Sequence, residues 1–254
     1  MDTLTVGSLF AGIGGFDLGL ERAGMQVKWQ VEIDPYCLKV LEKHWPHVKR
    51  YTDIKTVDWS GVEPVDLVCG GFPCQDLSVA GKRAGIDGER SGLWSEYVRC
   101  LRALRPRYVL VENVPGLLAN PAMGRVLGDL AESGYDAEWD CLPASAFGSH
   151  HLRDRIWIIA YPYSERRDFS VFASGGLRQI ERTQFWKSFR GIDNSLQVQE
   201  YASICGVLDG LSARMDGRLH AIGNAVVPQV VEWIGRQIVK AEEALTDQHF
   251  PPIP

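Results

Sequence analysis

Short apolar runs alternate with amphipathic stretches along most of this chain. Runs rich in Val, Ile and Leu predict strands at residues 4–10, 27–33, 48–51, 65–69, 108–111, 138–142 and 156–161. Stretches with helical periodicity lie between them and predict helices that end at Arg22, begin at Pro35, and span 93–104, 123–133 and 229–244. Strands that alternate with helices in this way predict an α/β fold, with a mostly parallel sheet and helices on both faces.

A glycine-rich turn follows the first predicted strand, with the sequence Phe10-Ala11-Gly12-Ile13-Gly14-Gly15. Glycines at this place let a ligand approach the backbone, and the start of the next helix adds partial positive charge. The spacing is not that of a GxGxxG fingerprint. The turn is therefore also compatible with a tight strand-to-helix connection that binds nothing.

Acidic residues follow the second and third predicted strands. Glu32 lies where a nucleotide-binding α/β fold places the acceptor for ribose hydroxyls, and no basic residue nearby favours a 2′-phosphate. Asp34 is expected to cap the helix that begins at Pro35, because proline is favoured at the first helical position. Asp53 either reaches a base edge or forms a turn.

The strand predicted at 65–69 ends in Gly70-Gly71-Phe72-Pro73-Cys74. Such a break carries the next side chain beyond the carboxyl end of the strand, where open α/β sheets bind ligands. Pro73 stiffens the backbone that presents Cys74. Cys74 is either a nucleophile held over a pocket or an ordinary buried thiol, since free cysteines are often buried.

Two further groups are expected at the same edge of the sheet. Glu112 ends the strand predicted at 108–111, and a desolvated carboxyl there could have a raised pKa and donate a proton. Its alternatives are a helix cap or a pairing with an arginine. Arg153 and Arg155 fall on one face of an extended segment, which suits a carbonyl or phosphate contact or a surface ladder with Asp154.

Charge is unevenly distributed along the chain. The net charge is -5, yet segments 82–107 and 150–190 each carry four more basic than acidic residues. The glycine-hinged basic loop after Cys74 suggests a lid over an anionic substrate. Aromatic and basic residues alternate between 162 and 217, as in nucleic-acid contacts, although solvated faces and a small packed annex fit the same patterns.

Composition narrows the class of protein. The 254 residues are 45% hydrophobic and 23% charged, which suits one large α/β domain with or without a small annex. No apolar run reaches the roughly 18 residues of a membrane helix, and no signal peptide is visible, so no membrane partner is expected. The six cysteines are expected to be reduced, and the lack of a CxxC spacing argues against a structural metal.

Taken in this order, these stretches resemble the DNA (cytosine-5) methyltransferase family. The resemblance covers most of residues 4–160 and 221–239. The pairing of Pro-Cys-Gln with Glu-Asn-Val is its most specific feature. The motifs that carry the resemblance read SLFAGIGGFDLGLERAG, VEIDPYC, GGFPCQDLSVAG, ENVPG, HHLRDR and IGNAVVPQ.

The resemblance implies a Rossmann-like methyltransferase fold with a small irregular target-recognition region. The family takes its methyl group from S-adenosyl-L-methionine and releases S-adenosyl-L-homocysteine. Glu32 would accept the ribose hydroxyls. The other residues that would line the cofactor pocket are Phe10, Gly12, Ile13, Gly14, Ile33, Asp53, Ile54, Leu93, Asn224 and Val226.

The resemblance also assigns the chemistry. Cys74 would be the nucleophile, Glu112 the acid that holds the cytosine ring, and Arg155, supported by Arg153, the contact to the ring carbonyl. Cytosine inside a duplex cannot be reached, so the base must be flipped out of double-stranded DNA. The residues expected to contact DNA are Gln75, Ser78, Lys82 and Arg83.

The chain departs from the family pattern in three places. His151 replaces a glutamine, residues 211–218 replace an arginine-rich segment, and the variable region is short. The expected organisation is a catalytic and cofactor-binding domain over 1–161, a target-recognition region over 162–217, and a segment over 218–248 that returns to the catalytic domain. We expect a monomer in the cytoplasm of a bacterial or phage-infected cell, associated with the nucleoid through DNA.

Two other functions remain open at this stage. One is an RNA cytosine methyltransferase of the same build, although the Cys-Phe-Thr signature of RNA-acting relatives is not found. The other is a non-catalytic module that binds the cofactor or nucleic acid. The retention of Cys74, Glu112 and Arg155 argues against this second alternative.

Overall fold

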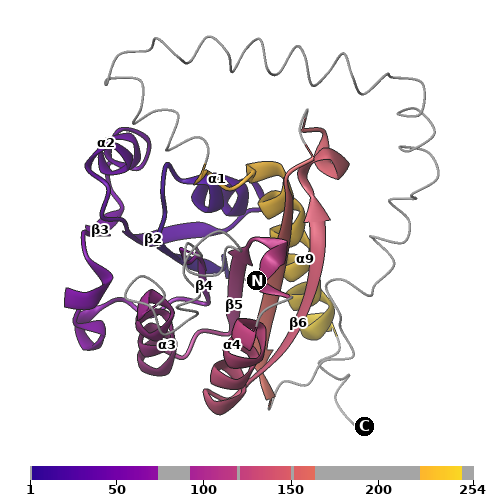
Figure 1. Cartoon of the computed structure of the whole chain (residues 1–254). Coiled ribbons are helices and arrows are strands. Elements are labelled where there is room, and N and C mark those ends of the chain that lie inside the picture. The colour runs from indigo at the N-terminus through magenta and orange to yellow at the C-terminus, as the bar shows by residue number, and fades with distance from the viewer. Residues whose placement is uncertain (1, 74–91, 119–120, 150–151, 164–223, 248–254) are drawn as a thin grey trace, which may run out of the picture.

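A seven-stranded sheet forms the centre of the computed structural model, which describes residues 2–73, 92–118, 121–149, 152–163 and 224–247. The strand order is β3-β2-β1-β4-β5-β7-β6 (Figure 1). Neighbouring strands run parallel from β3 to β5, whereas β7 is antiparallel to both β5 and β6. The strands are β1 (Thr5–Leu9), β2 (Gln26–Val31), β3 (Lys49–Tyr51), β4 (Leu67–Gly71), β5 (Tyr108–Asn113), β6 (Tyr135–Pro143) and β7 (Asp154–Pro162).

Helices cover both faces of this sheet. The helices are α1 (Gly15–Arg22), α2 (Pro35–His44), α3 (Gly92–Leu104), α4 (Pro121–Glu132) and α9 (Pro228–Asp247). Four short 3-10 turns are η1 (Ile54–Thr56), η2 (Trp59–Gly61), η4 (Pro115–Leu117) and η5 (Ala144–Phe147). Residues of α3 and α4 pack into one core layer and residues of α1 and α9 into the other. The layered α/β architecture expected from the sequence is therefore confirmed.

The alternation of side chains along β5 shows why this strand is buried on both faces. Val109 and Val111 point into the layer beneath α3 and α4, whereas Tyr108 and Leu110 point into the layer beneath α1 and α9. A central strand with helices packed on both of its faces needs apolar side chains on both faces. This explains the unbroken apolar run from Tyr108 to Val111. Glu112, two residues beyond Leu110, follows the same alternation toward the α1 and α9 side.

The predicted elements agree with the structure to within a few residues. Among the strands, β6 extends furthest beyond its predicted bounds, since it was predicted over 138–142 and is observed over Tyr135–Pro143. β6 lies at the edge of the sheet, and most of its residues are only half buried. Apolar patterning is weaker along such an edge strand, so its ends are hard to find from sequence.

The C-terminal helix α9 returns to the first helix of the chain. Figure 1 shows α9 beside α1, and the two helices are closely packed. A Cβ atom on Gly19 would lie 2.5 Å from the Cβ of Val231, so only glycine allows α9 this close. At its other end α9 is held by the buried Glu242, which accepts hydrogen bonds of 2.6 Å from both Arg107 and Tyr108.

The parallel strands bring distant turns to a common edge. Register pairs Leu9 of β1 with Gly70 of β4, and Gly71 of β4 with Glu112 of β5. The turns that follow β1, β2, β4 and β5 therefore meet at the carboxyl edge of the sheet, where open α/β sheets bind ligands. None of the helices in the described part of the chain is both long and apolar enough to cross a membrane.

Candidate active site

The turn after β1 holds its backbone in an unusual conformation. Phe10, Gly12 and Gly14 have φ angles of 51°, 56° and 88°, and Gly14 is the N-cap of α1. A positive φ is uncommon for a residue other than glycine, and strain of this kind clusters at ligand sites. A Cβ atom built on Gly12 would meet nothing within 4 Å. The turn is thus a strained cradle with open space beside it at the start of a helix.

Glu32 ties this turn to the end of β2. Its carboxylate accepts hydrogen bonds from the backbone N–H groups of Gly12 at 2.6 Å, Ile33 at 2.8 Å and Asp34 at 2.7 Å. A carboxylate has about four acceptor positions, so one remains for a ligand hydroxyl. Glu32 therefore shapes the predicted pocket as well as lying in it, a role that the sequence did not indicate.

The residues around Glu32 divide into a cap and an exposed apolar side chain. Asp34 caps α2, as expected, by accepting hydrogen bonds from Tyr36 and Cys37 at 2.8 and 2.9 Å. Ile33 is 69% exposed although it is strongly apolar. An exposed isoleucine beside a carboxylate and a glycine turn provides a surface on which a flat apolar group can lie.

The turn after β3 approaches the same edge. Asp53 caps η1 by accepting a hydrogen bond from the Lys55 N–H at 2.9 Å, so the turn-forming alternative left open by the sequence is present. The Ile54 side chain is only 3% exposed and packs into the core. Leu93, near the start of α3, packs against the same core layer.

Glu112 lies at the end of β5 and pairs with Arg155. The Arg155 Nε and Glu112 Oε1 atoms are 2.9 Å apart. Burial raises the pKa of the Glu112 carboxyl above its usual value, while Arg155 and Arg153 oppose this effect. Of the alternatives left open by the sequence, the arginine pairing is therefore present, and it coexists with the raised pKa expected of a proton donor.

A small cavity of about 10 Å³ lies behind this pair. Its lining comes from β5, β6, β7, η5 and the C-terminal segment, and consists of Glu112, Leu142, Ala144, Arg153, Arg155, Trp157, Val227 and Val230. Both arginines line it, although Arg153 lies just before β7 and its φ of 33° departs from the extended segment expected there. Arg153 also donates a 2.8 Å hydrogen bond to the carbonyl of Ala225. The arginine segment is thereby joined to the C-terminal residues that contain Asn224 and Val226.

Two neighbours of Glu112 were not singled out by the sequence. A Cβ atom on Gly71 would lie 2.8 Å from Glu112 Oε2, so glycine is needed to let the carboxylate lie against β4. Asn113 donates a 3.2 Å hydrogen bond to the Phe72 carbonyl. It thereby joins the end of β5 to the segment that leads to Cys74. The Gly-Gly pair and the Glu-Asn dipeptide were the signals that could have revealed these residues.

Several predicted site residues lie outside the described part of the chain. They are Cys74, Gln75, Ser78, Lys82 and Arg83. Pro73 is the last described residue before Cys74. The structure therefore brings together Glu112, Arg153, Arg155 and the cofactor-pocket candidates at one edge of the sheet, with the chain leaving that edge toward Cys74.

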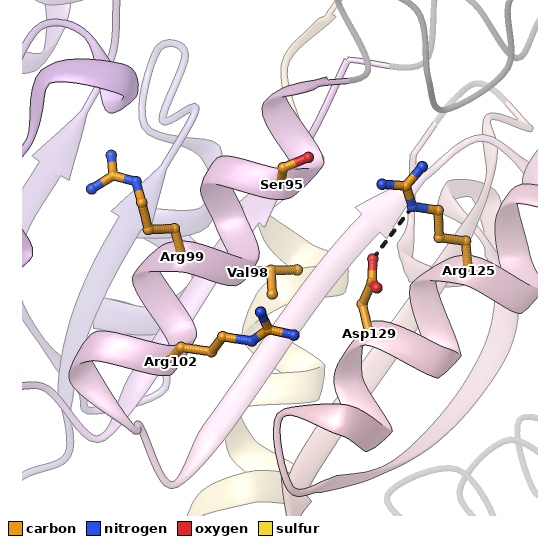
Figure 2. Close-up of a pocket in the computed structure, with 6 residues that line it drawn as sticks. All are labelled: Ser95, Val98, Arg99, Arg102, Arg125 and Asp129. Atoms are coloured by element: carbon orange, nitrogen blue, oxygen red, sulfur yellow. Dashed lines mark ion pairs between the residues drawn. The ribbon is translucent and has the colours of Figure 1, made fainter.

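A larger cavity, of about 290 Å³, lies elsewhere, between α3 and α4 (Figure 2). Its lining is Ser95, Val98, Arg99, Arg102, Arg125 and Asp129. Its arginines are paired with acids: Arg125 lies 3.7 Å from Asp129, and Arg102 lies 3.6 Å from Glu132. None of the residues predicted for the active site lines this cavity, so size alone does not locate the chemistry.

Comparisons with known proteins identify the family. The family model for C-5 cytosine-specific DNA methylase matches residues 4–200. The type II methyltransferase M2.BsuMI of Bacillus subtilis is 27% identical over 96% of this chain and 77% of that protein. The type II methyltransferase M.Eco47II of Escherichia coli is 38% identical over 61% of this chain and 39% of that protein. Several further relatives are matched over 33% to 52% of their own length.

A solved structure supports the fold independently of close sequence similarity. The methyltransferase EhMeth of Entamoeba histolytica matches with a TM-score of 0.57 at 18% identity, over 67% of this chain and 56% of that chain. This likeness concerns the fold, and it confirms the methyltransferase-type α/β sheet expected from the resemblance. Because the family model spans well over half of the sequence, the chain belongs to the C-5 cytosine-specific DNA methylase family.

Proposed function

We propose that this protein transfers a methyl group from S-adenosyl-L-methionine to C5 of a cytosine flipped out of double-stranded DNA. Family membership and the type II methyltransferases among its relatives support this reaction. The observation that carries it is the buried Glu112 carboxyl, paired with Arg155 beside the strand end that leads to Cys74. An acid and a cation at this edge of the sheet, together with the thiol assigned to Cys74, suit the activation of a pyrimidine ring.

The turns after β1, β2 and β3 fit the proposed cofactor. Glu32 keeps about one acceptor position for a ribose hydroxyl, and the exposed Ile33 offers an apolar surface for adenine. Gly12 has open space beside it, and Gly14, with a φ of 88°, is the N-cap from which α1 begins. The remaining residues assigned to this pocket are Ile13, Asp53, Ile54, Leu93, Asn224 and Val226.

The reaction needs a nucleophile because C5 of cytosine is itself a poor one. The bound cofactor supplies an electrophilic methyl group on a sulfonium. The Cys74 thiolate forms a bond to C6 of the ring, and the electron pair displaced toward C5 makes that carbon nucleophilic. Transfer of the methyl group to C5 would break its bond to the sulfonium sulfur and leave S-adenosyl-L-homocysteine. Transfer of the C5 proton to water or another base, with cleavage of the bond between Cys74 and C6, then restores the C5–C6 double bond and the thiolate.

Glu112 and Arg155 stabilise the charge that develops during this addition. A Glu112 carboxyl with a raised pKa can share a proton with N3 of the ring, which favours attack at C6. Arg155 is assigned to the ring carbonyl O2, where its guanidinium can donate a hydrogen bond to the growing negative charge. Arg153 supports this arrangement through its hydrogen bond to Ala225.

Contacts to DNA are assigned to Gln75, Ser78, Lys82 and Arg83 in the loop after Cys74. Residues 162–217 are assigned to target recognition, between a catalytic domain over 1–161 and a returning segment over 218–248. One site is sufficient for the reaction, so we propose a monomer. The relatives come from bacteria and a Bacillus phage, which supports a place with the DNA in the bacterial cytoplasm.

Tritium transfer from labelled cofactor tests this function directly. Wild-type protein is mixed with labelled cofactor and duplex DNA and, separately, with tRNA. The nucleic acid is then precipitated with acid and washed, and the label that it retains is counted. The expected result is label in DNA, none in tRNA, and none with Cys74→Ser. Label in tRNA alone would transfer the proposal to RNA, and label in neither would leave only a binding role.

A further inference from the structure

The side chain of Arg99, on α3, donates hydrogen bonds to the backbone of the turn that follows β3. Its Nη2 atom donates a 2.7 Å hydrogen bond to the carbonyl of Ile54, and its Nη1 atom donates a 2.9 Å bond to the carbonyl of Val57. These two carbonyls lie at the two ends of η1, because Ile54 is its first residue and Val57 is its C-cap. One guanidinium therefore clamps the segment that carries Asp53 and Ile54.

Other contacts fix the guanidinium itself. Arg99 Nε lies 2.7 Å from the Glu96 carboxylate, one turn earlier on α3. Its guanidinium carbon lies 5.9 Å from the centre of the Trp59 ring, within cation–π range. The orientation of Arg99 is thus set by one carboxylate and one aromatic ring. Arg99 is consequently a rigid arm between α3 and the turn, in spite of being near the surface.

Arg99 supplies hydrogen bonds that the turn does not make internally. η1 contains only three residues, and its internal hydrogen bonds come from Asp53, which accepts from Lys55 and Thr56. The carbonyls of Ile54 and Val57 are outside this internal set and are satisfied by Arg99. Charge-assisted hydrogen bonds of this kind are stronger than neutral ones, so their loss would free the backbone of the turn.

Figure 2 shows that Arg99 and Arg102, which are both on α3, extend to different sides of this helix. Arg102 extends toward α4, whereas Arg99 extends to the opposite side of α3. Arg102 lies 3.6 Å from Glu132 and donates to Ser133 Oγ at 3.3 Å, so it joins α3 to α4. The two arginines share charge and helix but serve different neighbours. Arg102 is therefore the matched control for Arg99.

We infer that Arg99 is a positioning residue for the adenosine side of the cofactor site. This inference rests on the proposed function, because Asp53 and Ile54 are assigned to the cofactor there. Arg99 acts through the backbone of the turn without touching the cofactor. A lysine would keep the charge but could not reach two carbonyls with a planar fork.

Calorimetric titration with S-adenosyl-L-homocysteine tests the inference without any turnover. Arg99→Gln is expected to weaken binding about tenfold, which corresponds to about 1.4 kcal/mol. Arg99→Lys is expected to fall between Gln and wild type, and Arg102→Gln to bind like wild type. Affinity for duplex DNA, measured without cofactor, is expected to stay unchanged in all three variants.

Hydrogen exchange of the apo protein supplies a second readout. In Arg99→Gln the amides of residues 53–57 should exchange faster, while those of α4 should not. Faster exchange throughout the chain, or equal loss of cofactor and DNA binding, would mean a general structural defect and would overturn the inference. So would Arg99→Gln that binds S-adenosyl-L-homocysteine as tightly as wild type. If wild type itself binds no S-adenosyl-L-homocysteine, the cofactor assignment fails first and the inference falls with it.

Discussion

Gly71→Ala should inactivate the protein while leaving it folded. The added Cβ atom would lie 2.8 Å from Glu112 Oε2, and a contact under 3.0 Å requires a shift. The carboxylate cannot swing freely, because Glu112 Oε1 is held at 2.9 Å by Arg155 Nε and the cavity behind them measures only about 10 Å³. The expected result is a displaced carboxyl group at the reacting ring.

The magnitude follows from the size of that displacement. Moving a catalytic group by a large fraction of an ångström can cost roughly 10²-fold in rate, so kcat should fall about a hundredfold. Overpacking of a core position costs about 1–3 kcal/mol, which would lower Tm by several degrees in a chain of this length. Binding of S-adenosyl-L-homocysteine should be unchanged, because the three atoms nearest to the added Cβ all belong to Glu112 and none to the turns after β1 and β2.

The assay is tritium transfer to duplex DNA at saturating cofactor, with Tm measured on the same preparations. Gly128→Ala on α4 is the matched control, since its Cβ would meet nothing within 4 Å and alanine favours a helix. Its kcat should equal that of wild type. The double variant of Gly71→Ala with Glu112→Gln should be no slower than Glu112→Gln alone, because both changes act on one carboxyl. Gly71→Ala with wild-type kcat, or additive losses in the double variant, would refute the reasoning.

Three further predictions concern stability, measured by urea denaturation. Burial raises the pKa of Asp17 from 3.8 to about 6. The folded state thus holds the proton more tightly, so stability should fall by about 3 kcal/mol as pH rises through this window. Asp17→Asn should remove this dependence, and an unchanged pH profile in that variant would contradict it. Asp34→Ala removes the cap of α2 and should cost about 1 kcal/mol, so an unaltered midpoint would show that the cap is dispensable. Gly15→Ala would place a Cβ 2.5 Å from the carbonyl of Val226 and should cost about 1–3 kcal/mol, whereas Gly61→Ala, with open space, should cost less than half of that. Equal effects at the two glycines would argue against close packing of the C-terminal segment.

The sequence was most informative where a local pattern has a local cause. Apolar runs between glycines and prolines located the strands and helices, because burial and backbone stiffness act over a few residues. Asp34 could be identified as a cap for the same reason, since a cap reaches only two or three residues along the chain. Glu112 could be placed at a strand end because its own strand could be recognised.

Which of these groups contact one another depends on the assembled fold. The antiparallel β7 brings Arg155 to Glu112, and the register of β4 with β5 makes Gly71 the neighbour of that carboxylate. Glu32 binds Gly12, and Arg99 clamps the turn at Ile54, across 20 and 45 positions of sequence. Hydrophobic periodicity specifies which face of an element is buried, but strand order and register depend on pairings between distant segments. The residues proposed for the chemistry could therefore be selected from the sequence, whereas the glycine beside Glu112 and the arginine bonded to the turn after β3 could be recognised only once the sheet was assembled.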